Sequence, residues 1–149
     1  MVLWRSCAPI SSIESMTRLL HAAAAGLVLV ALGACAAGPS AAPVTLQLRE
    51  LNESGVSGTV ILTAIDDART LVEVDVEAAG LLNMPAHIHP GTCAELVPQP
   101  TYALQNVIDG RSSTEVAASL EELLSGGQAL NIHTSNEQMD VYSACGELS

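Results

Sequence analysis

Apolar and polar residues alternate along much of the chain from residue 44 onward. The clearest cases are residues 44–49 and 72–77, in which Val or Leu occupies every second position. Successive side chains of a β-strand point to opposite faces of the sheet, so this period predicts strands with one buried face.

Further short apolar segments follow, and turn-forming residues such as Asn-Glu-Ser-Gly and Asp-Gly separate several of them. The predicted strands are residues 44–49, 56–65, 72–77, 84–89, 104–108, 113–118, 129–133 and 142–148. Residues 119–124 carry the one helical signal, with an N-cap serine, early acidic residues and a following Gly-Gly stop. The pattern predicts an all-β sandwich or barrel of about eight antiparallel strands with one short helix.

Residues 1–34 have the features of a signal peptide. Arg18 precedes an apolar run of 14 residues, from Leu19 to Leu32, which is too short to cross a hydrocarbon core of about 30 Å. The sequence that ends it, Leu-Gly-Ala followed by Cys35, resembles the lipobox of bacterial lipoproteins. The resemblance implies a lipidated Cys35 that anchors the protein in the bacterial cell envelope, outside the cytoplasm. An ordinary cleaved signal with a chance cysteine is the alternative.

The start of the chain and the region after Cys35 complete the predicted organisation. Met16 is a more usual beginning for such a leader, so we expect residues 1–15 to lie upstream of the true start. Residues 36–43 read AAGPSAAP, a composition typical of a flexible linker. The predicted order is therefore a signal peptide (1–34), a lipidated tether (35–43) and one β domain (44–149).

The composition after the leader excludes several kinds of ligand. Residues 35–149 contain three Arg, no Lys and 15 acidic residues, a net charge of −12. Such a surface repels nucleic-acid phosphates and anionic lipid headgroups, so the lipid anchor is the only membrane contact that we expect. The same residues contain no Phe or Trp and two Tyr, which leaves little for stacking of bases or sugars.

Two cysteines remain after Cys35, namely Cys93 and Cys145. In an exported chain two such thiols are normally paired. A bridge between them would close a loop of about 50 residues and stabilise the fold by about 4 kcal/mol in the chain-entropy model. Two buried free thiols are the alternative. The chain has no Cys-x-x-Cys spacing, which is the pattern that would indicate a redox role.

The region after the leader contains only three histidines, His87, His89 and His133. The first two form a His-Ile-His motif on a predicted strand, where alternate residues share a face with Cα atoms about 6.6–7 Å apart. Two imidazoles at this spacing can reach one ion, and His133, at the end of another predicted strand, could supply a third ligand. Neutral imidazoles suit copper and zinc. A solvated histidine pair that binds no ion is the alternative.

Three short motifs resemble the copper/zinc superoxide dismutases. They are Pro-Ala-His-Ile-His-Pro-Gly-Thr-Cys at 85–93, Asn-Ile-His at 131–133 and Ala-Cys-Gly-Glu-Leu at 144–148. That family has a His-x-His pair, a downstream Cys, a later His at a strand end and a closing Ala-Cys-Gly. It folds as a Greek-key β barrel in which the two cysteines form a disulfide.

The resemblance implies a Greek-key fold like that of the superoxide dismutases, with the Cys93–Cys145 disulfide of the family. It also implies that His87, His89 and His133 bind one copper ion and that superoxide is the substrate. The segment Leu-Asn-Ile-His-Thr at 130–134, before a final Gly-x-Leu, also resembles the CHRD module, an extracellular β domain with no established chemistry.

Two departures from the dismutase pattern bear on activity. No His lies between Cys93 and Leu130, which excludes a zinc site of the family's type. The family has an Arg three residues before its second Cys that attracts superoxide, and Tyr142 stands at that position here. Arg111 is the only basic residue in the second half of the chain, and nothing in the sequence places it near the histidines.

The sequence therefore leaves two functional hypotheses. The first is an extracytoplasmic copper-binding lipoprotein of superoxide-dismutase-like fold, either a copper-only dismutase or a degenerate relative. The second is a non-enzymatic, CHRD-like module that serves adhesion, copper buffering or envelope structure.

Overall fold

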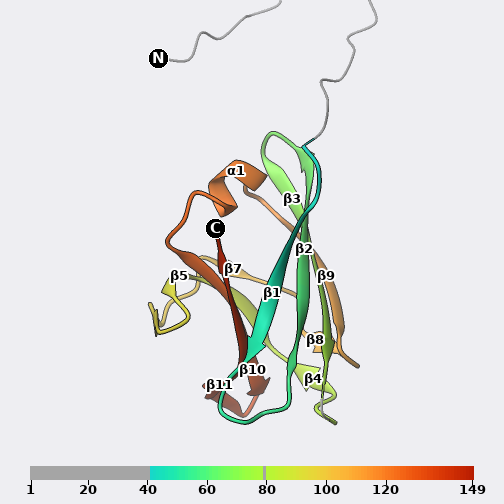
Figure 1. Cartoon of the computed structure of the whole chain (residues 1–149), viewed down its shortest axis with the longest axis vertical. Helices are drawn as coiled ribbons and strands as arrows, with labels where there is room; N and C mark the ends of the chain where they lie inside the picture. Colours follow the sequence, from blue (N-terminus) through green and yellow to red (C-terminus); the bar gives the residue numbers. More distant parts are fainter. Residues whose placement is uncertain (1–40, 79) are drawn as a thin grey trace, which may run out of the picture. The chain divides into compact units, whose positions relative to one another are not determined.

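The computed structural model describes residues 41–78 and 80–149 (Figure 1). The chain divides into two units, residues 1–35 and 36–149, and every described residue belongs to the second. The predicted signal peptide and the lipidation of Cys35 lie outside the described residues. Of the predicted tether only residues 41–43 are described, and they are exposed and form no regular element.

The described residues form eleven strands and one helix. Seven strands have six or more residues: β1 (Val44–Glu50), β2 (Ser57–Asp66), β3 (Arg69–Glu77), β5 (Ala86–Thr92), β9 (Arg111–Val116), β10 (Gln128–Ser135) and β11 (Gln138–Leu148). Four strands have two residues: β4 (Asn83–Met84), β6 (Glu95–Leu96), β7 (Tyr102–Ala103) and β8 (Val107–Ile108). The helix is α1 (Leu120–Leu123). The all-β prediction is confirmed, with more strands than the eight expected.

The strands form one curled antiparallel sheet in the order β4-β8-β9-β3-β2-β1-β11-β10-β5-β6, with β7 paired to β5. Two walls can be distinguished, because β1 and β11 pair over only two residue pairs. The first wall contains β9, β3, β2 and β1, and the second contains β11, β10 and β5 (Figure 1). The chain crosses between the walls after β4, β7 and β9, as in the predicted Greek key.

Two predicted strands correspond least closely to the structure. The segment 84–89 is divided at Pro85, and β5 then continues through Pro90 to Thr92 instead of ending at the Pro-Gly pair. Gly91 permits this continuation, because its φ is +110° and a Cβ there would lie 2.2 Å from the Glu95 carbonyl oxygen on β6. The segment 104–108 forms a strand only at β8, because the Leu104 amide bonds instead to the Ala86 carbonyl.

The hydrophobic core lies between the two walls and is almost entirely aliphatic. The first wall contributes residues such as Val60, Leu62 and Val72, and the second contributes Ile88 and Leu130, all of which are fully buried. Since side chains alternate along a strand, the neighbours of Ile88 on β5 point to the opposite, outer face of the second wall. This alternation determines where the functional side chains lie.

The predicted helix is confirmed as a single turn, α1. The Ser119 side chain accepts a hydrogen bond from the Glu122 amide at the N-cap, and Leu120 and Leu123 are buried. Over residues 41–78 and 80–149, no helix has the length and apolar character needed to span a membrane.

The disulfide predicted from the cysteine count is present. Cys93, just after β5, bonds to Cys145 in β11, which lies 52 positions later in the sequence, with a Cα–Cα distance of 5.8 Å. The bond attaches the segment that follows β5 to the strand at the other side of β10.

We expect removal of this disulfide to destabilise the protein substantially. Replacing Cys93 and Cys145 together by Ser frees the unfolded chain from a long closed loop, and the free energy of unfolding should fall by about 4 kcal/mol. Urea denaturation followed by circular dichroism would measure the difference. Wild-type protein treated with reductant should behave like the double variant, and a loss below about 1 kcal/mol for both would show that the bridge contributes little to stability.

Candidate metal centre

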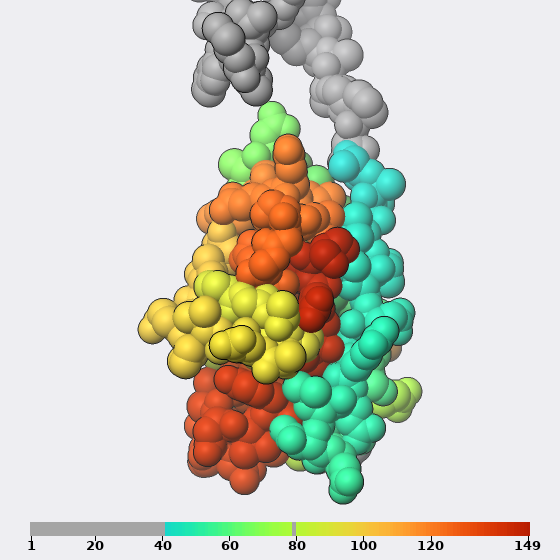
Figure 2. All heavy atoms as spheres, turned by 60° about the vertical axis from the view of Figure 1, so that its left-hand side comes forward, coloured from blue at the N-terminus to red at the C-terminus, as the bar shows by residue number. Residues whose placement is uncertain are grey.

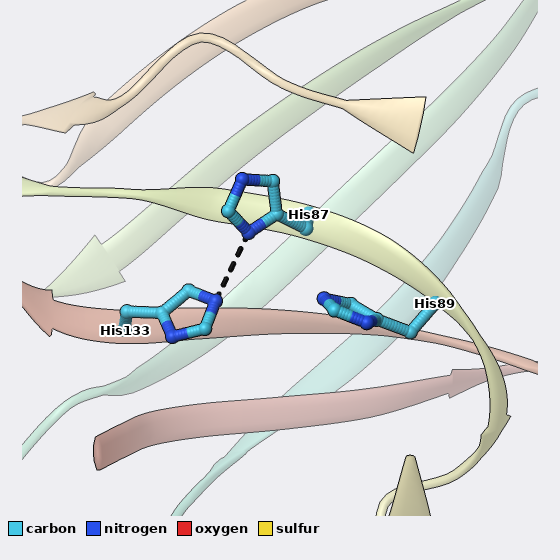
Figure 3. Close-up of side chains that lie close together, drawn as sticks. All are labelled: His87, His89 and His133. Carbon is cyan, nitrogen blue, oxygen red and sulfur yellow. Dashed lines mark hydrogen bonds between the residues drawn. The ribbon is translucent and has the colours of Figure 1, made fainter. Parts of the chain in front are cut away.

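The pairing of β5 with β10 brings the three histidines together on the outer face of the second wall. His87 is the register partner of Asn131, and His133 follows Asn131 by two residues on the same face. His89 lies two residues after His87 on β5. One ring nitrogen from each histidine lies within 4.8 Å of the others, and Figure 3 shows the rings converging from the two strands.

The closest approach joins Nδ1 of His87 to Nε2 of His133, which are 2.9 Å apart. Two imidazole nitrogens at this distance either share a proton or direct both lone pairs toward one cation between the strands. The ring centroid of His87 lies 5.0 Å from that of His133 and 5.6 Å from that of His89. This spacing is compact enough for all three rings to contact a single ion.

His89 supplies the strongest indication that the site fits a metal. Its Nδ1 lies 2.8 Å from the Val97 carbonyl oxygen, so Nδ1 carries the proton and Nε2 keeps its lone pair. The His89 residue is 2% exposed, and Nε2 is buried without a hydrogen-bond partner. A buried acceptor without a partner costs about 1–3 kcal/mol. A metal ion would use this lone pair directly.

The electrostatic environment keeps the imidazoles in the form that binds metals. Burial lowers the pKa of His87, and the neighbouring His89 lowers it further. Burial also lowers the pKa of His133, and His87 acts in the same direction. Both shifts favour the neutral form of these two rings, which is the form that binds a metal, and the proton shared by His87 Nδ1 and His133 Nε2 would have to leave the space between them when a cation binds.

The donor set favours a borderline transition metal. It consists of three imidazole nitrogens without a carboxylate or thiolate, and within the described part of the chain no other cluster of three such groups could hold an ion. Calcium and magnesium require oxygen ligands, whereas copper and zinc bind imidazole. The residues therefore fit the copper ion that the sequence resemblance implies.

The surroundings of the site include groups that the sequence did not reveal. The Val97 carbonyl orients His89, and a backbone oxygen has no sequence signature. Asn131 is fully buried beside His133, and its polar side chain between Leu130 and Ile132 was an available signal. Tyr142 is the register partner of His133 on β11, with ring centroids 5.1 Å apart, so a neutral ring lies at the rim of the site.

Arg111 does not contribute to this site. It lies on β9 in the first wall, where its guanidinium approaches the Asp75 carboxylate at 3.4 Å, and both side chains are exposed.

Figure 2 shows the face of the second wall, with the yellow segment that contains β5 between the orange segment of α1 and the red-orange β10–β11 hairpin. These segments are distant in sequence and adjacent on this face of the domain.

Acidification should destabilise the metal-free protein, because the two histidines resist protonation in the folded state. Because the folded-state pKa values of His87 and His133 are lowered, the unfolded chain takes up protons first as the pH falls below about 6.5. The free energy of unfolding of metal-free protein should therefore decrease between about pH 7.5 and 5.5. Urea denaturation across this range and NMR titration of the imidazole protons would measure the effect. Midpoints at or above the ordinary histidine value for both rings would contradict the prediction.

Comparison with known proteins supports the fold. No protein-family model and no curated protein sequence matches the chain. Among solved structures, an Asp-to-Asn mutant of superoxide dismutase 5 of Candida albicans is similar, with a TM-score of 0.50 and 19% identity over 70% of this chain and 88% of that chain. A Glu-to-Ala mutant of the same protein has a TM-score of 0.46 and 18% identity over 74% and 89%. The chain therefore has a superoxide-dismutase-like β fold.

Proposed function

We propose that the protein binds one copper ion through Nδ1 of His87, Nε2 of His89 and Nε2 of His133. The observation that carries the proposal is the buried Nε2 of His89. Its lone pair is fixed by the bond from Nδ1 to Val97, has no partner and belongs to the same compact group as the other two nitrogens. Three neutral imidazoles bind copper(II) more tightly than other divalent ions of the first transition series.

The zinc site of the copper/zinc dismutases has no counterpart in this proposal. Such a site needs further histidines between Cys93 and Leu130, and this segment contains none. One ion per chain is therefore the expected stoichiometry.

Superoxide dismutation is a second step of the proposal, supported by the likeness of the fold to a superoxide dismutase. Copper would supply the one-electron cycling between two oxidation states. Partly exposed His87 leaves an edge of the site open to a small anion, while His89 and His133 are buried. The acidic character of residues 35–149 and the neutral Tyr142 at the rim reduce the electrostatic attraction of superoxide, so we expect a slow dismutase.

We further propose that the protein acts outside the cytoplasm, anchored by a lipid on Cys35. The disulfide supports an oxidising compartment, where such bonds persist. If the copper experiment below fails, the second hypothesis from the sequence, a non-enzymatic CHRD-like module, becomes the better explanation.

Copper binding can be tested on purified protein titrated with copper(II). Wild type should retain one ion per chain and give an electron paramagnetic resonance spectrum of nitrogen ligation, and His89→Ala should lose both because it removes the oriented Nε2. Thr134→Ala is a matched control, since the Thr134 hydroxyl bonds to Ser143 and not to a histidine. Wild-type protein that keeps no copper after dialysis would refute the proposal.

Dismutation can be tested by restoring a cation at the rim of the site. Tyr142→Arg should raise the rate of superoxide decay by about tenfold at low salt, because a positive charge beside His133 attracts the anion, and added salt should reduce the gain. Stopped-flow measurement with copper-loaded protein gives the rates. Tyr142→Phe controls for the altered packing and should show no gain. Equal rates for the Arg variant and wild type, at equal copper content, would disprove an electrostatic limit at this position.

A further inference from the structure

One buried polar side chain at the histidine site is not explained by the fold. Asn131 lies on β10 and is 0% exposed. Its register partners are His87 on β5 and Cys145 on β11, so its side chain shares the outer face of the second wall with the histidines. An amide at this position has to be satisfied by the site itself, because water does not reach it.

The hydrogen bonds of Asn131 are incomplete. Its Nδ2 lies 3.4 Å from Nε2 of His133, which is a long contact, and its Oδ1 is buried without a partner. Burying a carbonyl oxygen in this way costs about 1–3 kcal/mol, whereas a leucine of similar shape would avoid that cost. The side chain thus has an unused oxygen on the same amide whose nitrogen contacts a proposed copper ligand.

We propose that Asn131 is a fourth metal-binding residue of this site and presents its carboxamide oxygen to oxidised copper. The inference rests on the proposed function, since it assumes that the three histidines hold the ion. In metal-free protein the same amide donates from Nδ2 to His133. Rotation of the terminal amide exchanges the nitrogen and the oxygen with little movement of other atoms.

The chemistry of the two oxidation states explains why an amide oxygen suits this place. Copper(I) is soft and is satisfied by three nitrogen ligands, whereas copper(II) gains from a further oxygen donor. An amide oxygen is neutral and weak, so it stabilises copper(II) without preventing reduction. Asn131 would therefore set the relative affinity of the site for the two oxidation states.

The test compares two substitutions of similar size. Asn131→Leu removes the oxygen, and we expect copper(II) affinity to fall by about tenfold or more while copper(I) affinity is unchanged. Asn131→Asp keeps the shape and adds negative charge, and copper(II) affinity should rise relative to copper(I). Competition with chelators specific for each oxidation state measures the affinities. The copper(II) electron paramagnetic resonance spectrum should change in both variants.

Stability of the metal-free protein separates this role from a structural one. Metal-free Asn131→Leu should unfold at the same urea concentration as wild type or at a higher one, because an unpartnered buried oxygen has been removed. Ser143→Ala is the control, since Ser143 is equally buried and its hydroxyl pairs with Thr134. That control should lose stability and keep the wild-type copper spectrum.

Three results would overturn the inference. They are an unchanged copper(II) spectrum in both variants, an equal fall of both copper affinities in Asn131→Leu, and no relative gain of copper(II) affinity in Asn131→Asp. Failure of the proposed function is distinguishable, because wild-type protein would then bind no copper with nitrogen ligation.

Discussion

The antiparallel pairing of β5 with β10 is the constraint on which the site depends. Ile88 points into the core between the two walls, and this commits His87 and His89 to the outer face. The register that places His87 opposite Asn131 then determines that His133 approaches from the neighbouring strand. A shift of one residue in either strand would turn the histidines inward and expose the aliphatic side chains. The hydrophobic core thus positions the three histidines that we propose as copper ligands, although its side chains lie on the opposite face of the strands.

The segment that follows β5 has a second, more local function. The disulfide between Cys93 and Cys145 attaches it to β11, and the Val97 carbonyl within it fixes the proton on Nδ1 of His89. Covalent attachment reduces the number of conformations in which this carbonyl could move away from the ring. Orientation of ligand nitrogens by such outer hydrogen bonds is a general requirement of metal sites. The bridge therefore supports both the stability of the domain and the tautomer of a proposed ligand.

Much of this arrangement could be predicted from the sequence, because it depends on local patterns. Alternation of apolar residues predicts the strands, the spacing of His87 and His89 predicts a shared face, and the small number of cysteines predicts the bridge. The continuation of the fourth strand through Pro90 and Gly91 depends on its pairing with the start of β10, which is non-local. Sequence patterns identify side chains but not their partners across the sheet. The contact of the Val97 carbonyl with His89 and the position of Asn131 opposite His87 therefore required the structure.

The distribution of unsatisfied polar atoms supports the proposal that the histidine site holds a bound group. Within residues 41–78 and 80–149, five buried side-chain nitrogen or oxygen atoms have no hydrogen-bond partner, and three of them belong to His89, Asn131 and His133. The core beneath these residues is buried and almost entirely aliphatic, so the unpartnered polar atoms gather on the outer face of the second wall. The unpartnered Nε2 of His89 and Oδ1 of Asn131 cost stability in the metal-free protein, and a cation that accepts their lone pairs would recover that cost. A domain of this size tolerates such local instability because the aliphatic core and the disulfide stabilise the rest of the fold.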